Sequence, residues 1–289
     1  MRSFAYARPY TLQEALTLLA DQGARAGILA GGTDLLVRLR AGRQIPDVVV
    51  DLKRVAELRS DVSEVDGMLR IGARTVLTDV IEDARVLRSF PALVEAASVV
   101  GSIQIRNRAT LTGNICNASP AADTAPALLV YEAIVNLVGT GGERKVPIAE
   151  FVLGPGRTAL QCGEIVHSID LPVPDERDGS AFGRITRRFG VDLATINVCC
   201  RVRSSGETCF AFGAAAPRPF LARDRTGMLA QPTLDPDTRD AILCDLISDA
   251  APISDIRASQ EYRKAMLLVA SRRAWQTALE RLHGTGALP

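Results

Sequence analysis

Short apolar strands and short helices alternate through about the first fifty residues, and this alternation limits the fold more than any other feature of the sequence. Thr11 and Glu14 form the T-x-x-E pattern of a capping box, which predicts the start of a helix. Buried strands are expected at 27–30 and 48–52, with a short helix at 35–40 between them. The chain therefore opens with a small unit of strands and helices.

The middle of the chain continues as a mixture of strands and helices, up to a turn-rich, charged segment at 172–180. The strands are expected at 69–72, 133–138, 145–148 and 164–171, and the helices at 75–83 and 91–99. Residues 106–123 are predicted as a long loop without regular structure, and such loops are often functional. Gly139 and Gly142 bound a predicted hairpin turn.

After the turn-rich segment the pattern changes, which indicates a second domain. Strands are expected at 181–188, 195–203 and 208–215, followed by helices at 236–248 and 259–283. We place the domains at 1–174 and 175–289, and divide the first into subdomains of about 1–56 and 57–174.

Composition excludes several classes of protein. Lys and Arg total 34 against 33 Asp and Glu, a balance that argues against a nucleic-acid binder. No apolar run approaches the roughly 18 residues of a membrane-spanning helix, and the N-terminus lacks a signal peptide's apolar segment, so a cytoplasmic protein is expected. The six cysteines show no metal-ligand spacing and are expected to be free and buried. With only two histidines, a Ser-His-Asp hydrolase or a His-rich metal site is poorly supported.

The first polar loop, Ala-Gly-Gly-Thr-Asp at 30–34, stands between an expected strand and an expected helix. Two adjacent glycines remove two Cβ atoms, so a ligand can approach the main chain closely. The N–H groups of such a turn favour an anion, for example a pyrophosphate. The same residues are also compatible with a plain turn.

The second polar loop, at 110–123, carries Thr, Asn, Ser and Asp side chains around Gly113. Their donors and acceptors suit ribityl hydroxyls, phosphates and the edge of a flavin. A loop that satisfies its own backbone is the alternative. Neither loop fits the G-x-G-x-x-G fingerprint, which disfavours a Rossmann dehydrogenase.

Taken together, the two loops stand about eighty residues apart, in the order of the flavin motifs of a known family. The chain resembles the flavin-binding medium subunits of the molybdenum hydroxylases, the family of xanthine dehydrogenase and aerobic carbon monoxide dehydrogenase. Residues 30–36 resemble the first motif, and 105–114 with 117–123 resemble the second. The segments 4–15, 163–172, 215–219 and 262–269 extend the resemblance over nearly the whole chain.

The resemblance implies an α+β fold, with a flavin domain of the p-cresol methylhydroxylase type and a smaller C-terminal domain. That second domain is expected to hold a three-stranded antiparallel sheet and helices. FAD is the implied cofactor, with no metal in this chain and no residue acting as general acid or base. The implied FAD-binding residues are Leu29, Ala30, Gly31, Gly32, Thr33, Asp34, Leu35, Thr110, Thr112, Gly113, Asn114, Asn117, Ser119, Asp123, Val166 and Arg184.

The function implied by the resemblance is electron transfer within a complex. A large subunit would hold the molybdenum cofactor, a small subunit the iron–sulfur clusters, and FAD would pass electrons to an external acceptor. We expect a heterotrimer, possibly doubled. Two alternatives stay open: a self-contained flavin reductase or oxidase of the same fold, and an assembly subunit without flavin. The second is suggested by Thr112, which stands where the family usually has a glycine.

Overall fold

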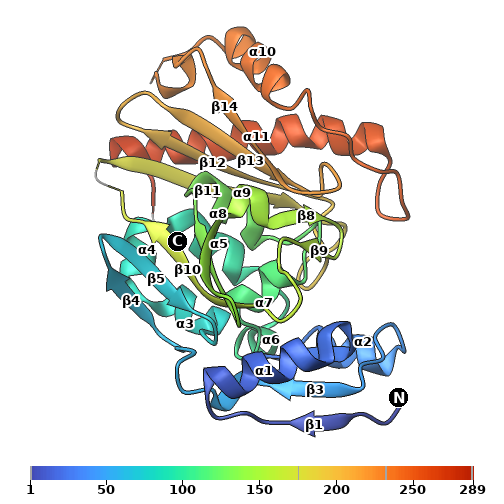
Figure 1. The fold of residues 1–289 in the computed structure, drawn as a ribbon. Helices are drawn as coiled ribbons and strands as arrows, with labels where there is room; N and C mark the ends of the chain where they lie inside the picture. The colour runs from blue at the N-terminus through green and yellow to red at the C-terminus, as the bar shows by residue number, and fades with distance from the viewer. Residues whose placement is uncertain (1, 175, 232, 288) are drawn as a thin grey trace.

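Three larger sheets follow one another along the chain in the computed structural model of this protein, each with helices packed beside it (Figure 1), and two further short strands pair with each other. The structure describes residues 2–174, 176–231, 233–287 and 289. The expected α+β fold class is confirmed. Residue 175, where we place the start of the second domain, lies outside the described residues. No helix in the described ranges is both long and apolar enough to cross a lipid bilayer.

The N-terminal sheet is small and parallel, with its strands in the order β1, β3, β2. Its elements are β1 (Ala5–Ala7), α1 (Leu12–Gln22), β2 (Ala26–Leu29), α2 (Leu35–Arg40) and β3 (Val48–Asp51), with 3-10 turns at Gly23–Arg25 and Leu52–Arg54. The predicted capping box is confirmed, because the Glu14 N–H donates to the Thr11 hydroxyl at 3.2 Å and the Thr11 N–H donates to the Glu14 carboxylate at 3.3 Å. The sequence does not predict β1, since this three-residue edge strand is mostly exposed.

The second sheet is antiparallel, with its strands in the order β4, β5, β10, β6, β7. These strands are β4 (Val62–Val65), β5 (Met68–Gly72), β6 (Ile134–Gly139), β7 (Gly142–Pro147) and β10 (Ile165–Pro172). Gly139 and Gly142 are paired at the end of β6 and β7, which confirms the predicted hairpin. Between β7 and β10 lie α9 (Ile148–Phe151), β8 (Val152–Gly154) and β9 (Arg157–Thr158).

Six short helices connect β5 to β6: α3 (Leu77–Glu82), α4 (Ala84–Ser89), α5 (Pro91–Ser98), α6 (Ile103–Arg106), α7 (Leu111–Cys116) and α8 (Thr124–Val130). The prediction of a structureless loop at 106–123 is wrong, because Thr110 starts α7 by accepting a hydrogen bond from the Gly113 N–H at 3.0 Å. Asp83 caps α4 in the same way, and this separate helix follows directly on α3.

The third sheet has four antiparallel strands, one more than the sequence predicts. Its elements are β11 (Asp178–Ile185), β12 (Ile196–Arg203), β13 (Thr208–Gly213), β14 (Phe220–Asp224), a 3-10 turn at Met228–Ala230, α10 (Pro236–Leu246) and α11 (Gln260–His283). The additional strand, β14, lies at the sheet edge and is mostly half-buried, so it carries no clear apolar alternation. Strand β11 begins inside the expected break at 172–180, which is therefore shorter than predicted.

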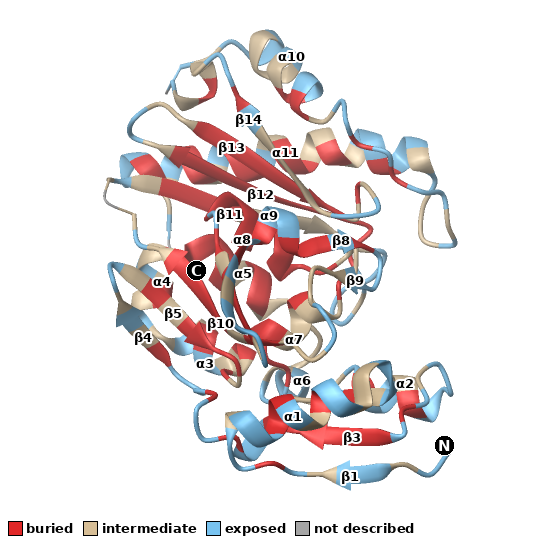
Figure 2. Ribbon diagram, viewed as in Figure 1, coloured by how far each residue is buried: buried red, intermediate tan, exposed pale blue. Residues whose placement is uncertain are grey.

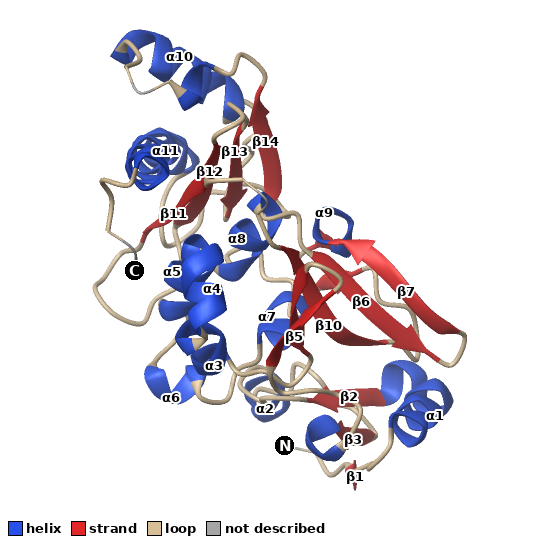
Figure 3. Ribbon diagram, turned by 90° about the vertical axis from the view of Figure 1, so that its left-hand side faces the viewer, coloured by secondary structure: helices blue, strands red, loops and turns tan. Residues whose placement is uncertain are grey.

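The third sheet is covered on both faces, and its two central strands, β12 and β13, are largely buried (Figure 2). Helix α11 packs along one face, while α5 and α8 pack against the other, as the side view shows (Figure 3). Neighbouring residues of β12 therefore enter different cores: Cys200 lies on the side of α11, and Cys199 lies with Cys209 on the side of α5 and α8. These three free cysteines are buried as expected, whereas that expectation is wrong for Cys162 and Cys244, which are exposed.

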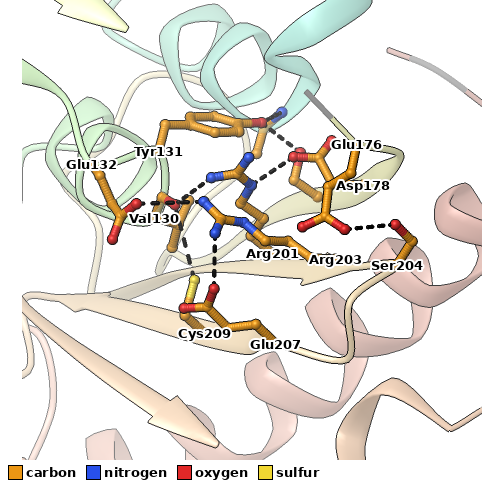
Figure 4. A network of polar contacts seen from close by, with 12 residues as sticks. Val130, Tyr131, Glu132, Glu176, Asp178, Arg201, Arg203, Ser204, Glu207 and Cys209 are labelled. Atoms are coloured by element: carbon orange, nitrogen blue, oxygen red, sulfur yellow. Dashed lines mark hydrogen bonds and ion pairs between the residues drawn. The ribbon is translucent and has the colours of Figure 1, made fainter. Parts of the chain in front are cut away.

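Buried charges join the third sheet to the C-terminal end of α8 (Figure 4). The Nε of Arg201 lies 2.6 Å from Oδ2 of Asp178, and the same guanidinium donates to the carbonyl oxygen of Val130 at 3.3 Å. It also lies over the ring of Tyr131, 5.4 Å from the ring centre. Both charged side chains are more than nine-tenths buried. Such a pair is costly to break, because a lone charge would remain out of water.

Candidate functional site

A cleft of about 530 Å³ opens where the N-terminal sheet meets the second sheet and its helices. The volume lies in the range of pockets that hold small ligands and cofactors, roughly 300–1,000 Å³. Residues of β2, α2, β10 and both polar loops line it, together with Asp192 and Leu193 from the connection between β11 and β12. The fold thus brings the two polar loops of the sequence to one cavity.

The first loop needs its glycines for two separate reasons. A Cβ on Gly31 would lie 2.0 Å from the carbonyl oxygen of Arg108, so this residue is pressed against the backbone that leads into the second loop. Gly32 has a φ of +82°, in the left-handed region that favours glycine. The loop therefore presents main chain rather than side chains, and it contacts the backbone directly before the second loop.

The second loop is ordered by hydrogen bonds among its own residues and to α8. Thr124 donates to the side-chain oxygen of Asn114 at 2.7 Å, and the Ala121 N–H donates to the Ser119 hydroxyl at 3.3 Å. Asn117 accepts a hydrogen bond from Arg38 of α2. The polar side chains expected to meet a ligand therefore start from defined positions.

Thr112 lies in the first turn of α7 and is buried. Its hydroxyl donates to the carbonyl oxygen of Ala73 at 2.6 Å, and it lies 3.3 Å from the hydroxyl of Thr110. The hydroxyl is thus satisfied by the protein itself. The departure from the family's usual glycine therefore adds a hydrogen bond to the segment that follows β5.

Asp123 closes the second loop and is held by the third sheet. Its two carboxylate oxygens contact Nη1 of Arg184 at 3.0 Å and Nδ2 of Asn197 at 2.9 Å. Arg184 and Asn197 face each other in the pairing of β11 with β12. Burial raises the pKa of the Asp123 carboxyl from 3.8 to about 6, although the hydrogen bond from Asn197 and the charge of Arg184 favour the ionised form.

Fourteen of the sixteen residues predicted to bind FAD line the cleft. The two that do not are Leu29 and Arg184. Leu29 ends β2, directly before the first loop. Arg184 contacts Asp123, the carbonyl oxygen of Val99 at 3.2 Å and that of Gly190 at 3.4 Å. Its guanidinium therefore braces the cleft wall from behind.

Sequence reasoning missed several residues of the cleft, among them Arg38, Arg74 and Asp192. Arg38 stands four residues after Asp34 on a correctly predicted helix, so helical spacing could have placed it on the same side. Arg74 and Asp192 come from segments whose position depends on the tertiary fold. The side chain of Asp192 is only 6% exposed, yet its Oδ2 has no hydrogen-bond partner among the described residues.

The lining of the cleft fits a flavin dinucleotide. The glycine loop allows close approach of a phosphate to the main chain, and the Asn, Ser and Asp side chains of the second loop suit hydroxyl groups. Leu52, Leu58 and Val166 supply apolar surface for a ring system. Within the described residues, no three His, Cys, Asp or Glu side chains are grouped as a metal site would need.

Two family models match the chain in succession. Residues 2–174 match the FAD binding domain in molybdopterin dehydrogenase, and residues 181–278 match the CO dehydrogenase flavoprotein C-terminal domain. The chain is 38% identical over 280 residues to the xanthine dehydrogenase FAD-binding subunit of Escherichia coli O157:H7, covering 95% of this chain and 96% of that protein. It is 31% identical over 282 residues to the carbon monoxide dehydrogenase medium chain of Hydrogenophaga pseudoflava, covering 96% and 98%.

Solved structures agree with these matches. Carbon monoxide dehydrogenase from Hydrogenophaga pseudoflava superposes with a TM-score of 0.88 at 30% identity, covering 97% of this chain and 98% of that chain. Quinoline 2-oxidoreductase from Pseudomonas putida 86 gives a TM-score of 0.88 at 27% identity, covering 99% of both chains. The chain therefore belongs to the FAD-binding medium subunits of the molybdenum hydroxylases, an oxidoreductase family that includes the corresponding subunits of xanthine dehydrogenase and carbon monoxide dehydrogenase.

Proposed function

We propose that this chain is the electron-transfer subunit of a molybdenum hydroxylase complex. Its FAD would receive electrons from iron–sulfur clusters of a small subunit and pass them to an external acceptor, while the substrate reacts at a molybdenum cofactor in a large subunit. The observation that carries this proposal is the cleft formed by the two polar loops, which meet at Gly31 and the backbone of Arg108. Relatives named as medium chains support the partnership with other subunits.

FAD supplies the redox chemistry when it is bound, and the protein contributes binding, orientation and electrostatics. We propose that domain 1–174 holds it and that domain 175–289 braces the site. The glycines of the first loop would admit the diphosphate to the main chain, and the apolar residues of β10 would exclude water from the ring. The proposed FAD-binding residues are the fourteen named from the sequence that line the cleft: Ala30, Gly31, Gly32, Thr33, Asp34, Leu35, Thr110, Thr112, Gly113, Asn114, Asn117, Ser119, Asp123 and Val166. Leu29 and Arg184, also named from the sequence, are proposed to support the first loop and Asp123 from outside the cleft.

The test begins with the protein purified from its native host, without separating it from proteins that bind it. We expect one FAD per copy of this chain, together with a subunit containing molybdenum and a subunit containing iron. Anaerobic addition of the substrate of the complex should bleach the flavin absorption, and this bleaching should disappear when the iron–sulfur subunit is removed.

Purification of the chain alone, with flavin and with turnover of an organic substrate, would instead favour a self-contained flavin enzyme. A colourless complex that takes up no added FAD would favour an assembly subunit. We also propose a heterotrimer and a cytoplasmic location; the subunit ratio of the purified complex tests the first, and fractionation of the host cells tests the second.

A further inference from the structure

Arg38 is a cation on the cleft surface that belongs to neither polar loop. It lies in the last turn of α2 and is half-buried. Its Nη2 donates a hydrogen bond to the side-chain oxygen of Asn117, across the cleft from α2 to the second loop. Arg38 therefore stands where the segment after the first loop and the second loop converge.

The second guanidinium of the cleft is already engaged elsewhere. The charged residues that line the cleft are Asp34, Arg38, Arg74, Asp123 and Asp192. Arg74 donates to the backbone carbonyl oxygens of Leu58 and Lys53, so its guanidinium is directed at the main chain. Two of the three carboxylates already face arginines outside the lining: Asp123 contacts Arg184 at 3.0 Å. Asp192 lies 3.9 Å from both Arg187 and Arg188. Arg38 is therefore the lining guanidinium best placed to meet the negative charge of a bound diphosphate.

The surroundings of Arg38 leave donors for an anion. Asp34 is four residues earlier on α2, a spacing at which helical ion pairs form. The observed partner of the guanidinium is nevertheless the neutral amide of Asn117. A guanidinium has five N–H donors, and one contact with an amide leaves most of them for a ligand.

We propose that Arg38 binds the diphosphate of FAD and makes this cleft select the dinucleotide over riboflavin. This inference rests on the proposed function. The diphosphate is the charged part of FAD, and the planar fork of an arginine matches the spacing of phosphate oxygens. Asn117 orients the fork from the second loop. Arg38 thereby adds a positively charged side chain to a phosphate site that the two sequence motifs build from main-chain N–H groups and from amide, hydroxyl and carboxylate side chains.

The experiment compares the affinities of FAD and riboflavin for the full chain, freed of flavin and kept in the complex in which it purifies. Replacing Arg38 with Ala should weaken the binding of FAD by about 10- to 100-fold, as expected for the loss of a hydrogen bond to a charged group. The same replacement should leave the binding of riboflavin unchanged. ADP should compete with FAD on the wild-type chain and lose most of its potency on the variant. Increasing salt concentration should lower the FAD affinity of the wild type more steeply than that of the variant.

Two further variants separate a phosphate contact from a structural role. Arg38→Lys keeps the charge and should recover part of the FAD affinity. Arg40→Ala removes an exposed arginine from the same helix and should change nothing. Alanine is a good helix former, so α2 should persist in both alanine variants. Arg38→Ala also loses the hydrogen bond to Asn117, so its flavin-free form should unfold at a slightly lower temperature than that of Arg40→Ala.

Equal losses for FAD and riboflavin would overturn the inference, because Arg38 would then shape the cleft rather than bind the diphosphate. Unchanged FAD affinity in Arg38→Ala would overturn it as well, while leaving the proposed function intact. A wild-type complex that binds no FAD would refute the proposed function itself, and the inference with it.

Discussion

The second sheet and its helices have two junctions, one with the N-terminal sheet and one with the third sheet, and these are built in opposite ways. The first, the open junction, encloses a cleft of about 530 Å³ and includes a main-chain contact of Gly31 with Arg108. The second, the filled junction, is occupied by α5, α8 and a buried ion pair (Figure 4). The first junction thus combines this main-chain contact with apolar packing against Ala73, Val138 and Ile165 and with the hydrogen bond from Arg38 to Asn117, around a cleft that stays open.

Residues of the third sheet, at the filled junction, also support the cleft at the open junction. Arg184 and Asn197 of the third sheet hold Asp123, which lines the cleft. The backbone N–H of Ala214, after β13, donates to the carbonyl oxygen of Pro120 at 2.6 Å. One wall of the cleft is therefore braced by a sheet more than fifty residues further along the chain. The other wall belongs to a small sheet whose main core is shared with Ala73, Val138 and Ile165 of the second sheet region.

The largest effect is expected at the filled junction. Replacing Arg201 with Met leaves Asp178 buried without its partner, and should lower the free energy of unfolding by about 4 kcal/mol. Without the Arg201 charge the pKa of Asp178, already raised by burial, should rise further. Urea unfolding of the flavin-free chain measures the loss.

The matched control replaces both partners by apolar residues. Arg201→Met combined with Asp178→Leu should recover most of the lost stability, because no uncompensated charge remains. A double variant as unstable as the single one would mean that packing around Arg201, including its contact with Tyr131, matters more than the charge pair.

At the open junction, Gly31→Ala should cost about 3 kcal/mol and abolish FAD binding. The new Cβ would lie 2.0 Å from the carbonyl oxygen of Arg108, and neither backbone can move aside cheaply. Gly141→Ala is the control, since a Cβ there meets nothing within 4 Å. Normal FAD affinity in Gly31→Ala would show that the contact between the loops does not shape the site.

The link between the two junctions should appear as a pH dependence of stability. The pKa of Asp123 is about 6 in the folded chain, against an ordinary value of 3.8. Protonation of this carboxyl therefore favours the folded chain, and its contribution to the free energy of unfolding is fully present below pH 3.8. As the pH rises through 6 that contribution is lost, at a cost of roughly 2 to 3 kcal/mol. As the pH rises from 3.8 to about 6, the wild type should therefore lose unfolding free energy relative to Asp123→Asn, which has no carboxyl to titrate. A constant difference would contradict the buried, bound state of the carboxyl.

Much of the fold could be predicted because its signals are local. The capping box at Thr11 and the short helix Leu35–Arg40 depend on neighbours within one or two turns, and both are confirmed. The strand β14 was missed because it is a half-buried edge, and α7 because its start depends on a single capping threonine among polar residues. Local patterns of apolar residues carry little information about such elements.

The candidate site divides in the same way. The two loops could be predicted as motifs, since their residues are contiguous in the sequence. The partners of Asp123 could not, because Arg184 and Asn197 come together only through the register of β11 with β12. The contact of Arg38 with Asn117 could not be predicted either, because it joins residues 79 positions apart in the sequence.

The smallest predicted effect concerns Thr112, which lines the cleft. Thr112→Val keeps the shape of the side chain and removes the hydrogen bond to the carbonyl oxygen of Ala73, so unfolding free energy should fall by about 1 kcal/mol. Thr112→Ser retains the hydroxyl and should remain closer to wild type. Because the hydroxyl is bound to the protein, FAD affinity in Thr112→Val should decline no more than stability does. A larger decline would mean that this hydroxyl contacts the cofactor.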